Sequence, residues 1–170
     1  PAEEATTAIP PVIDQAAYDS IRAYIEIGKR EARCVLAVDT SELVRETGGY
    51  YIGPHIFDEV APGARIAQEE IFGPVVSLIR VKNLEEGLNL IENSEYGNAA
   101  CLYTTNGQTA REFKYRAVAS MMAINLGIAA PMAFFPFGGA KGSFFGDIKG
   151  HGREVFQFFT DTKVVIQRWL

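Results

Sequence analysis

The sequence predicts an α/β fold with a mostly parallel sheet flanked by helices. Short apolar runs alternate with segments in which apolar residues recur every three or four positions, a pattern typical of strands and amphipathic helices. In the second half of the chain the order is strand, helix, strand, helix, strand, which favours parallel strands joined by helical crossovers. A chain of 170 residues with 48% hydrophobic residues can bury about 70% of its unfolded surface, so a packed core is expected.

The first half of the chain predicts one long helix and two strands. The helix opens at Asp14. Four residues at helical spacing form its predicted apolar face: Ile21, Tyr24, Ile25 and Gly28. Residues 34–38 form an apolar run bounded by charge, which favours a buried strand. Residues 39–49 indicate an exposed loop that ends at two glycines, and residues 50–52 a second strand.

The second half predicts three strands and two helices. The strands cover residues 75–81, 99–104 and 121–125. Asn83 and Glu86 form a helix-start signal that resembles a capping box. The apolar faces follow from Leu84, Leu88 and Ile91 in the first helix and from Ala110, Phe113 and Ala117 in the second.

Composition excludes several classes of protein. A net charge of −5 and a pI near 5.1 argue against a nucleic-acid partner, because phosphate binding needs a positive surface. No stretch is apolar enough for a membrane span, and no apolar signal segment opens the sequence. We therefore expect a cytoplasmic protein, or a mitochondrial-matrix protein if the source is eukaryotic, with no nucleic-acid or membrane partner.

The histidines and cysteines do not indicate a metal or a nucleophile. His55 and His151 have no aspartate or cysteine at ligand spacing, so we expect no metal site. Cys34 and Cys101 lie in predicted buried strands, where a thiol behaves as a small hydrophobe. We therefore assign no catalytic residue within the chain.

The last third of the chain contains a glycine-rich segment. Residues 138–152 contain six glycines, yet they lack both the ending of a phosphate-binding P-loop and a Gly-x-Gly-x-x-Gly run that opens a helix. We interpret these glycines as permitting unusual backbone angles, or close passage beside a ligand or a neighbouring subunit.

The run Glu-Glu-Ile-Phe-Gly-Pro at residues 69–74 has two interpretations. An ionised carboxylate can accept hydrogen bonds from both hydroxyls of a ribose, and a phenyl ring can pack against a flat heteroaromatic group. The alternative is a solvated acidic turn with Phe72 in the core. Composition alone favours the acidic turn.

Three motifs of the chain resemble those of one enzyme family. They are Gly-Tyr-Tyr-Ile-Gly-Pro at residues 49–54, Glu-Glu-Ile-Phe-Gly-Pro at residues 69–74 and Pro-Phe-Gly-Gly-Ala-Lys at residues 136–141. The C-terminal, catalytic-domain portion of the aldehyde dehydrogenase superfamily has similar motifs in the same order and at compatible spacing. The resemblance is strong from Gly49 onward, and it implies that residues 1–170 form part of one such catalytic domain.

Within the superfamily, the chain is most similar to methylmalonate-semialdehyde dehydrogenases. The segments that carry this likeness are residues 96–99, 130–135, 143–147 and 168–169. Residues 139–141 depart from it, because alanine stands where that group usually has tryptophan, and residues 119–125 are less rich in glycine and valine. The helix after Asp14 also resembles pyrroline-5-carboxylate dehydrogenases, which are the nearest rival.

The resemblance implies an NAD-dependent reaction on a small semialdehyde, with coenzyme A as the acyl acceptor. In this family a cysteine thiolate attacks the aldehyde and hydride passes to NAD. By position, Glu70 corresponds to the ligand of the nicotinamide ribose, Phe72 to the aromatic beside the nicotinamide, and Phe137 to an aromatic of the aldehyde pocket. The nucleophilic cysteine and its general base lie upstream of Pro1 in this family, so the chain alone is expected to be inactive.

The chain ends in a β-branched, apolar segment, residues 160–170. Such a strand either completes a sheet or pairs with another subunit. The family resemblance implies an intersubunit strand, so we expect a homo-oligomer, a dimer or a tetramer. The alternative to an enzyme fragment is a truncated, non-catalytic module that uses this strand for interaction.

Overall fold

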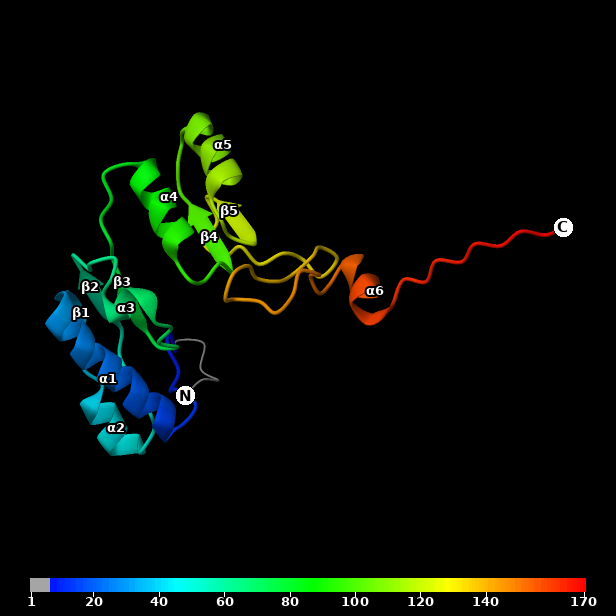
Figure 1. Ribbon diagram of the computed structural model, residues 1–170. Coiled ribbons are helices and arrows are strands. Elements are labelled where there is room, and N and C mark those ends of the chain that lie inside the picture. Colours follow the sequence, from blue (N-terminus) through cyan, green and yellow to red (C-terminus); the bar gives the residue numbers. More distant parts are fainter. Residues whose placement is uncertain (1–6) are drawn as a thin grey trace. The chain divides into compact units, whose positions relative to one another are not determined.

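The computed structural model describes residues 7–170 and divides the chain into two compact units, with the boundary between Val81 and Lys82 (Figure 1). The first unit contains α1 (Gln15–Glu31), β1 (Arg33–Ala37), α2 (Ser41–Thr47), β2 (His55–Asp58), α3 (Arg65–Gln68) and β3 (Val75–Ser77). The second contains α4 (Leu84–Asn93), β4 (Ala99–Leu102), α5 (Gly107–Arg116), β5 (Met121–Ile124) and α6 (Glu154–Phe159). No helix within residues 7–170 is long and apolar enough to cross a membrane.

The first unit packs α1 against a three-stranded sheet in the order β1-β2-β3. Asp14 caps α1 by accepting a hydrogen bond from the amide of Ala17 at 2.8 Å. Ile21 and Ile25 on α1 meet Phe57 of β2 in the core, and both Ile21 and Phe57 are fully buried. The apolar face predicted for this helix is therefore confirmed.

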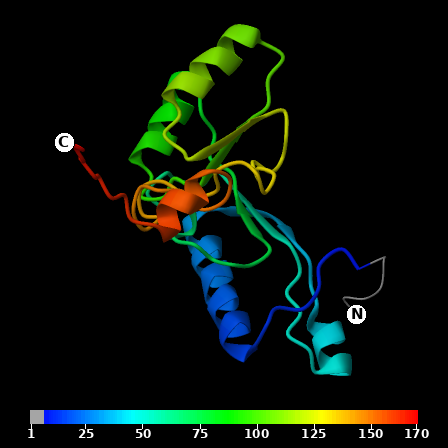
Figure 2. The same cartoon turned by 90° about the vertical axis from the view of Figure 1, so that its right-hand side faces the viewer.

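The second unit packs α4 and α5 side by side, as Figure 2 also shows, against the parallel pair β4–β5. Asn83 and Asn106 cap the two helices through their side-chain oxygens. Leu88, Phe113 and Ala117 form the buried cluster. These residues lie on the helical faces that the spacing predicts.

The α/β prediction is confirmed, and within residues 7–170 the strands form two sheets in which parallel pairing predominates. β2 pairs with β3 in parallel and β4 with β5 in parallel, whereas β1 pairs with β2 antiparallel. The connection from β1 to β2 contains the short helix α2 and returns the chain in the opposite direction.

Two local predictions in the first unit are wrong. Residues 41–47, expected as loop, form α2, which ends at Gly48 in the left-handed region (φ 69°) with its amide donating to the carbonyl of Val44 at 2.8 Å. Residues 50–52, expected as a strand, are irregular. The two glycines thus mark the end of a helix as well as a loop.

In the second unit, Cys101 and the C-terminal segment were expected to be a buried thiol and a strand. Cys101 is exposed and not buried, because it lies on the strand face opposite the residues that α4 and α5 cover. Residues 160–170 follow α6 as an extended segment without strand pairing, and Val164, Ile166 and Trp169 are each more than four-fifths exposed. The intersubunit strand remains a prediction.

Candidate cofactor and substrate site

The turn at residues 69–74 begins at a firmly held glutamate. Glu69 directly follows α3 and accepts hydrogen bonds from Nε and a terminal nitrogen of Arg65, at 2.9 and 2.8 Å. Its second partner is the hydroxyl of Tyr24 on α1, at 2.6 Å. These bonds, that of Arg65 first, lower the pKa of Glu69 to about 2, so the carboxylate is ionised at neutral pH.

Glu70 and Phe72 extend outward from the same turn. Within the described part of the chain, no group hydrogen-bonds the carboxylate of Glu70, which is exposed. Ile71 between them packs against the core of the first unit. Phe72 has a positive φ of 54° and is 83% exposed, so the interpretation that places it in the core is wrong.

The far end of the turn is also fixed. Gly73 packs on Ile21 so closely that a Cβ at this position would lie 2.7 Å from the Ile21 side chain. The carbonyl of Pro74 accepts a hydrogen bond from the amide of His55 at 2.9 Å. The turn therefore presents a free carboxylate and a free ring from a backbone held at both ends.

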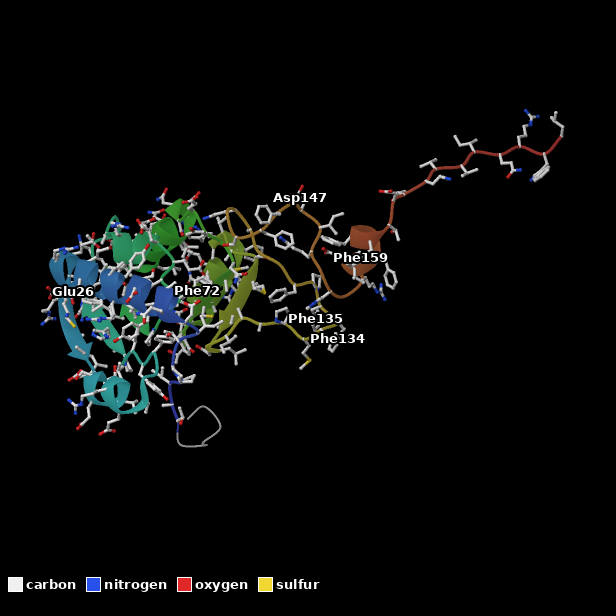
Figure 3. All side chains as sticks on the ribbon, turned by 90° about the horizontal axis from the view of Figure 1, so that it is seen from below. Glu26, Phe72, Phe134, Phe135, Asp147 and Phe159 are labelled. Atoms are coloured by element: carbon white, nitrogen blue, oxygen red, sulfur yellow. The ribbon has the colours of Figure 1, made fainter. Side chains whose placement is uncertain are left out.

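Phe137 belongs to the second unit. Its amide donates to the carbonyl of Gly150 at 2.8 Å, and its ring stacks on His151 with centroids 5.4 Å apart. Phe137 is 43% exposed, and the exposed Phe134 and Phe135 precede it, their rings 4.8 Å apart (Figure 3). The structure thus brings Glu70 and Phe72 onto one turn, whereas Phe137 lies in the other unit.

Two lysines hold the glycine-rich segment. The ammonium of Lys141 donates to the carbonyls of Ile91, Glu92 and Ser94 at 2.7, 2.9 and 3.0 Å, where α4 ends. The ammonium of Lys149 donates to the carbonyl of Gly139 and lies 4.7 Å from the centre of the Phe144 ring.

Glycines of this segment occur where the backbone packs closely or where φ is positive. A Cβ on Gly139 would lie 2.5 Å from the carbonyl oxygen of Ser143, and Gly146 and Gly152 have φ values of 83° and 59°. At Gly139 the close passage is beside the chain itself.

The cysteines and histidines form no catalytic group with one another. Cys34 is half-buried with its thiol 3.3 Å from the carbonyl of Leu36, and the exposed Cys101 thiol is 3.7 Å from the carbonyl of Gly127. Residues 7–170 contain no cluster of three side chains that could hold a metal ion.

Sequence reasoning missed the residues that hold the turn. Tyr24 and Glu69 are 45 positions apart, and no local pattern joins them. Glu69 lies four positions after Arg65, a spacing typical of a helical ion pair. The sequence therefore contained a signal from which this ion pair could have been predicted. Lys141 stands in a motif that the resemblance already identified, but its capping of α4 depends on tertiary contacts.

A separate groove of about 450 Å³ lies in the first unit between α1, the end of β1 and α2. Arg22, Lys29, Ser41 and Tyr51 are among its lining residues, and Glu70 and Phe72 are not. The groove is therefore distinct from the turn at residues 69–74.

Comparison with known proteins finds one family throughout. The model of the aldehyde dehydrogenase family matches residues 1–165. Malonate-semialdehyde dehydrogenase from Halalkalibacterium halodurans is 43% identical over 94% of this chain and 33% of its own length. A second such enzyme, from Shouchella clausii, is 44% identical over 94% of this chain and 32% of its own length. The chain thus spans about a third of the length of these curated relatives.

Solved structures give the same result. A methylmalonate-semialdehyde dehydrogenase from Oceanimonas doudoroffii matches 100% of this chain and 35% of its own, with a TM-score of 0.94 and 33% identity. A structure from Sinorhizobium meliloti, described as a methylmalonate-semialdehyde dehydrogenase complexed with NAD, matches 94% of this chain and 33% of its own, with a TM-score of 0.88 and 39% identity. A 1-pyrroline-5-carboxylate dehydrogenase from Thermus with bound NAD matches 77% of this chain and 25% of its own, with a TM-score of 0.68 and 36% identity.

Proposed function

The chain belongs to the aldehyde dehydrogenase family, and from this premise we propose that it is the C-terminal part of an NAD-dependent, CoA-acylating dehydrogenase of the methylmalonate-semialdehyde type. It contributes the contact to the nicotinamide ribose and part of the aldehyde pocket. The observation that carries the proposal is the turn at residues 69–74, with its free carboxylate and free aromatic ring held on a fixed backbone.

The turn fits an NAD nicotinamide riboside in its chemistry. The two oxygens of the Glu70 carboxylate can accept both ribose hydroxyls, and no competing donor among the described residues occupies them. The ring of Phe72 can pack on a flat heteroaromatic group. When bound, NAD supplies the hydride acceptor. The residues of this chain bind and orient it.

Phe137 supplies an apolar wall on the side of the aldehyde. The stacking of His151 on its ring and the hydrogen bond to Gly150 fix its orientation. A pre-oriented aromatic wall excludes water from the reacting carbon and limits the shape of the substrate chain. We assign the substrate to short semialdehydes because the named relatives act on malonate or methylmalonate semialdehyde.

Neither cysteine of the chain suits the nucleophile. Among residues 7–170 no basic side chain hydrogen-bonds either thiol, and the partner of each is a backbone carbonyl. The nucleophile and its base therefore come from another part of the enzyme, and the 170-residue chain alone is inactive.

The partly covered pair β4–β5 agrees with this division of the enzyme. Parallel strands are normally covered on both faces, yet here Ala99 and Cys101 remain exposed opposite α4 and α5. The rival assignment, pyrroline-5-carboxylate dehydrogenase, has less support because those structures match a smaller share of the chain.

The C-terminal segment, residues 160–170, is proposed as a strand that pairs with a second copy of the enzyme. Its exposed Val164, Ile166 and Trp169 give it the composition of a strand that is buried on assembly. Sedimentation of the protein from its complete reading frame, with and without residues 160–170, tests this role. We expect a dimer or a tetramer that dissociates on truncation, and an unchanged sedimentation coefficient contradicts the proposal.

An activity assay tests the proposed reaction. The protein is expressed from its complete reading frame and mixed with malonate or methylmalonate semialdehyde and NAD, with or without coenzyme A. We expect NADH formation that needs the semialdehyde and becomes faster with coenzyme A. No NADH formation with either substrate refutes the proposed activity, and a rate indifferent to coenzyme A refutes the acyl acceptor.

A further inference from the structure

The two adjacent carboxylates of the turn have different surroundings. Glu69 accepts three hydrogen bonds from Arg65 and Tyr24, whereas no described residue hydrogen-bonds Glu70. The ring of Tyr24 also lies 5.7 Å from the guanidinium carbon of Arg65, so the three side chains contact one another pairwise. The carboxylate of Glu69 thus stabilises the fold of the turn, whereas that of Glu70 can bind a ligand.

We propose that Glu69, Arg65 and Tyr24 form an anchor that positions Glu70 and Phe72 for the cofactor. The three are positioning residues, because none of them needs to touch the cofactor. This inference rests on the proposed function, because the anchor matters for catalysis only if the turn binds NAD.

The anchor joins the two helices α1 and α3 of the first unit to the start of the turn. Tyr24 lies on α1, Arg65 begins α3, and Glu69 is the residue at which α3 ends. A four-residue helix has little stability of its own, because helix nucleation is costly. The bond from Tyr24 therefore ties the start of the turn to the longest helix of the unit.

The conformation of Phe72 requires such a hold. A non-glycine residue in the left-handed region costs free energy and persists only where its surroundings impose it. The anchor at Glu69 constrains the backbone before Phe72, and the packing of Gly73 on Ile21 constrains it after. Release at Glu69 would let the backbone at Phe72 relax and change the direction of its ring.

The anchor also separates the charges of the two glutamates. The Arg65 guanidinium neutralises Glu69, and its hydrogen bonds are the main cause of the lowered pKa of that carboxyl. Glu70 keeps an uncompensated carboxylate for neutral hydroxyl donors. Without Arg65, two adjacent negative charges would compete for any donor that approaches the turn.

Substitutions in the protein from its complete reading frame test the anchor. Arg65→Ala removes the two donors that bind the two carboxylate oxygens of Glu69, and Arg65→Lys retains the charge. Arg45→Ala, which removes an arginine–glutamate ion pair on α2, is the control. The readouts are the KM for NAD, kcat, and hydrogen exchange at the amides of Glu69 and His55, which donate to the carbonyls of Arg65 and Pro74 at the two ends of the turn.

We expect Arg65→Ala to raise the KM for NAD about tenfold, with a smaller change in kcat, and to speed amide exchange at the turn. In Arg65→Lys the KM for NAD and the amide exchange rate should both lie close to the wild-type values. Arg45→Ala should change neither quantity. Glu70→Gln should raise the KM for NAD without changing amide exchange, because Glu70 does not hold the turn.

Two results would overturn the inference. If Arg65→Ala speeds exchange but leaves the KM for NAD unchanged, the anchor is structural only. If Arg65→Ala changes neither readout, there is no anchor. Failure of the wild-type protein to bind NAD is a different result: it refutes the proposed function and the cofactor role together, and amide exchange alone then decides whether the anchor holds the turn.

Discussion

The two units of the chain bury their apolar residues to very different extents. Among the residues that the structure describes, the first has a cluster of six buried residues that includes the fully buried Ile21 and Phe57. The second has a cluster of three, and large apolar side chains remain exposed from β5 to the C-terminus. They include Met122, Leu126, Ile128, Phe134, Phe145, Phe156, Phe159 and Ile166. Apolar exposure on this scale is typical of a surface that another polypeptide covers.

The difference in buried apolar clusters indicates that the two units have different roles. The first unit has the core to hold a strained turn in place, which the proposed cofactor contact requires. The second unit holds its glycine-rich segment with two lysines on backbone carbonyls, and polar bonds there take the place of a large core. Each of the following predictions tests this contrast.

The largest effect is expected in the core of the first unit. Phe57→Ala should lower the free energy of unfolding by about 4 kcal/mol, because Phe57 is fully buried between α1 and the sheet. Phe113→Ala should cost less, about 3 kcal/mol, since its cluster is smaller and easier to collapse. Urea unfolding followed by amide resonances of each unit measures both. An equal or larger loss for Phe113→Ala contradicts the contrast.

Acid should destabilise the first unit through Asp58. This buried carboxylate binds Arg80 at 2.6 Å and Arg33 at 3.1 Å, and hydrogen bonds, that from Arg80 first, lower its pKa from 3.8 to about 2. A lowered folded-state pKa contributes stability above pH 3.8, and this stability is lost as the pH falls toward 2.

Asp58→Asn should therefore destabilise the first unit at neutral pH by less than Phe57→Ala, and should flatten its stability between pH 4 and pH 2. Thermal unfolding across this range measures the slope. Glu69, with a pKa of about 2, contributes a residual slope of the same sign. A mutant as steep as the wild type would show that Asp58 is not a main source of acid sensitivity.

In the second unit, Lys141→Met should cost about 2 kcal/mol, because it leaves the last carbonyls of α4 without their charged donor. Lys82→Met is the control, since no hydrogen bond or ion pair of the Lys82 ammonium occurs within the described residues. Hydrogen exchange at residues 91–97 should become faster in Lys141→Met only. Equal exchange in the two variants would show that the lysine does not hold this segment.

The smallest effect should come from the C-terminus. Removal of residues 160–170 should change the free energy of unfolding of either unit by less than about 0.5 kcal/mol, because these side chains are exposed. Urea unfolding measures this change. A loss of more than that amount would mean that the segment packs on its own chain.

Elements with local signals were predictable from the sequence. Asp14 and Asn83 mark the starts of α1 and α4, because each caps its helix with its own side chain. α2 was missed because it buries no residue, and because Thr40, the residue before it, makes no capping hydrogen bond with its side chain. The strand β1 was predicted at residues 34–38, but its antiparallel direction was not, because hydrophobic periodicity carries no information on strand direction.

The site was predictable only in part. The motif at residues 69–74 identified Glu70 and Phe72 through the family resemblance, and the structure adds that both are free on a held turn. Tyr24 could not be found in the same way, since its bond to Glu69 joins α1 to the end of α3. Contacts between distant segments depend on packing and carry no local signal.

The most direct test of the account is the effect of Glu70→Gln on NAD binding, compared with Glu46→Gln, which removes the same charge from exposed α2. Isothermal titration of the protein from its complete reading frame gives both dissociation constants. The account predicts a Kd for NAD raised about tenfold in Glu70→Gln and unchanged in Glu46→Gln, which corresponds to about 1.4 kcal/mol of lost binding. Equal affinity in the two variants would contradict the assignment of Glu70 to the cofactor.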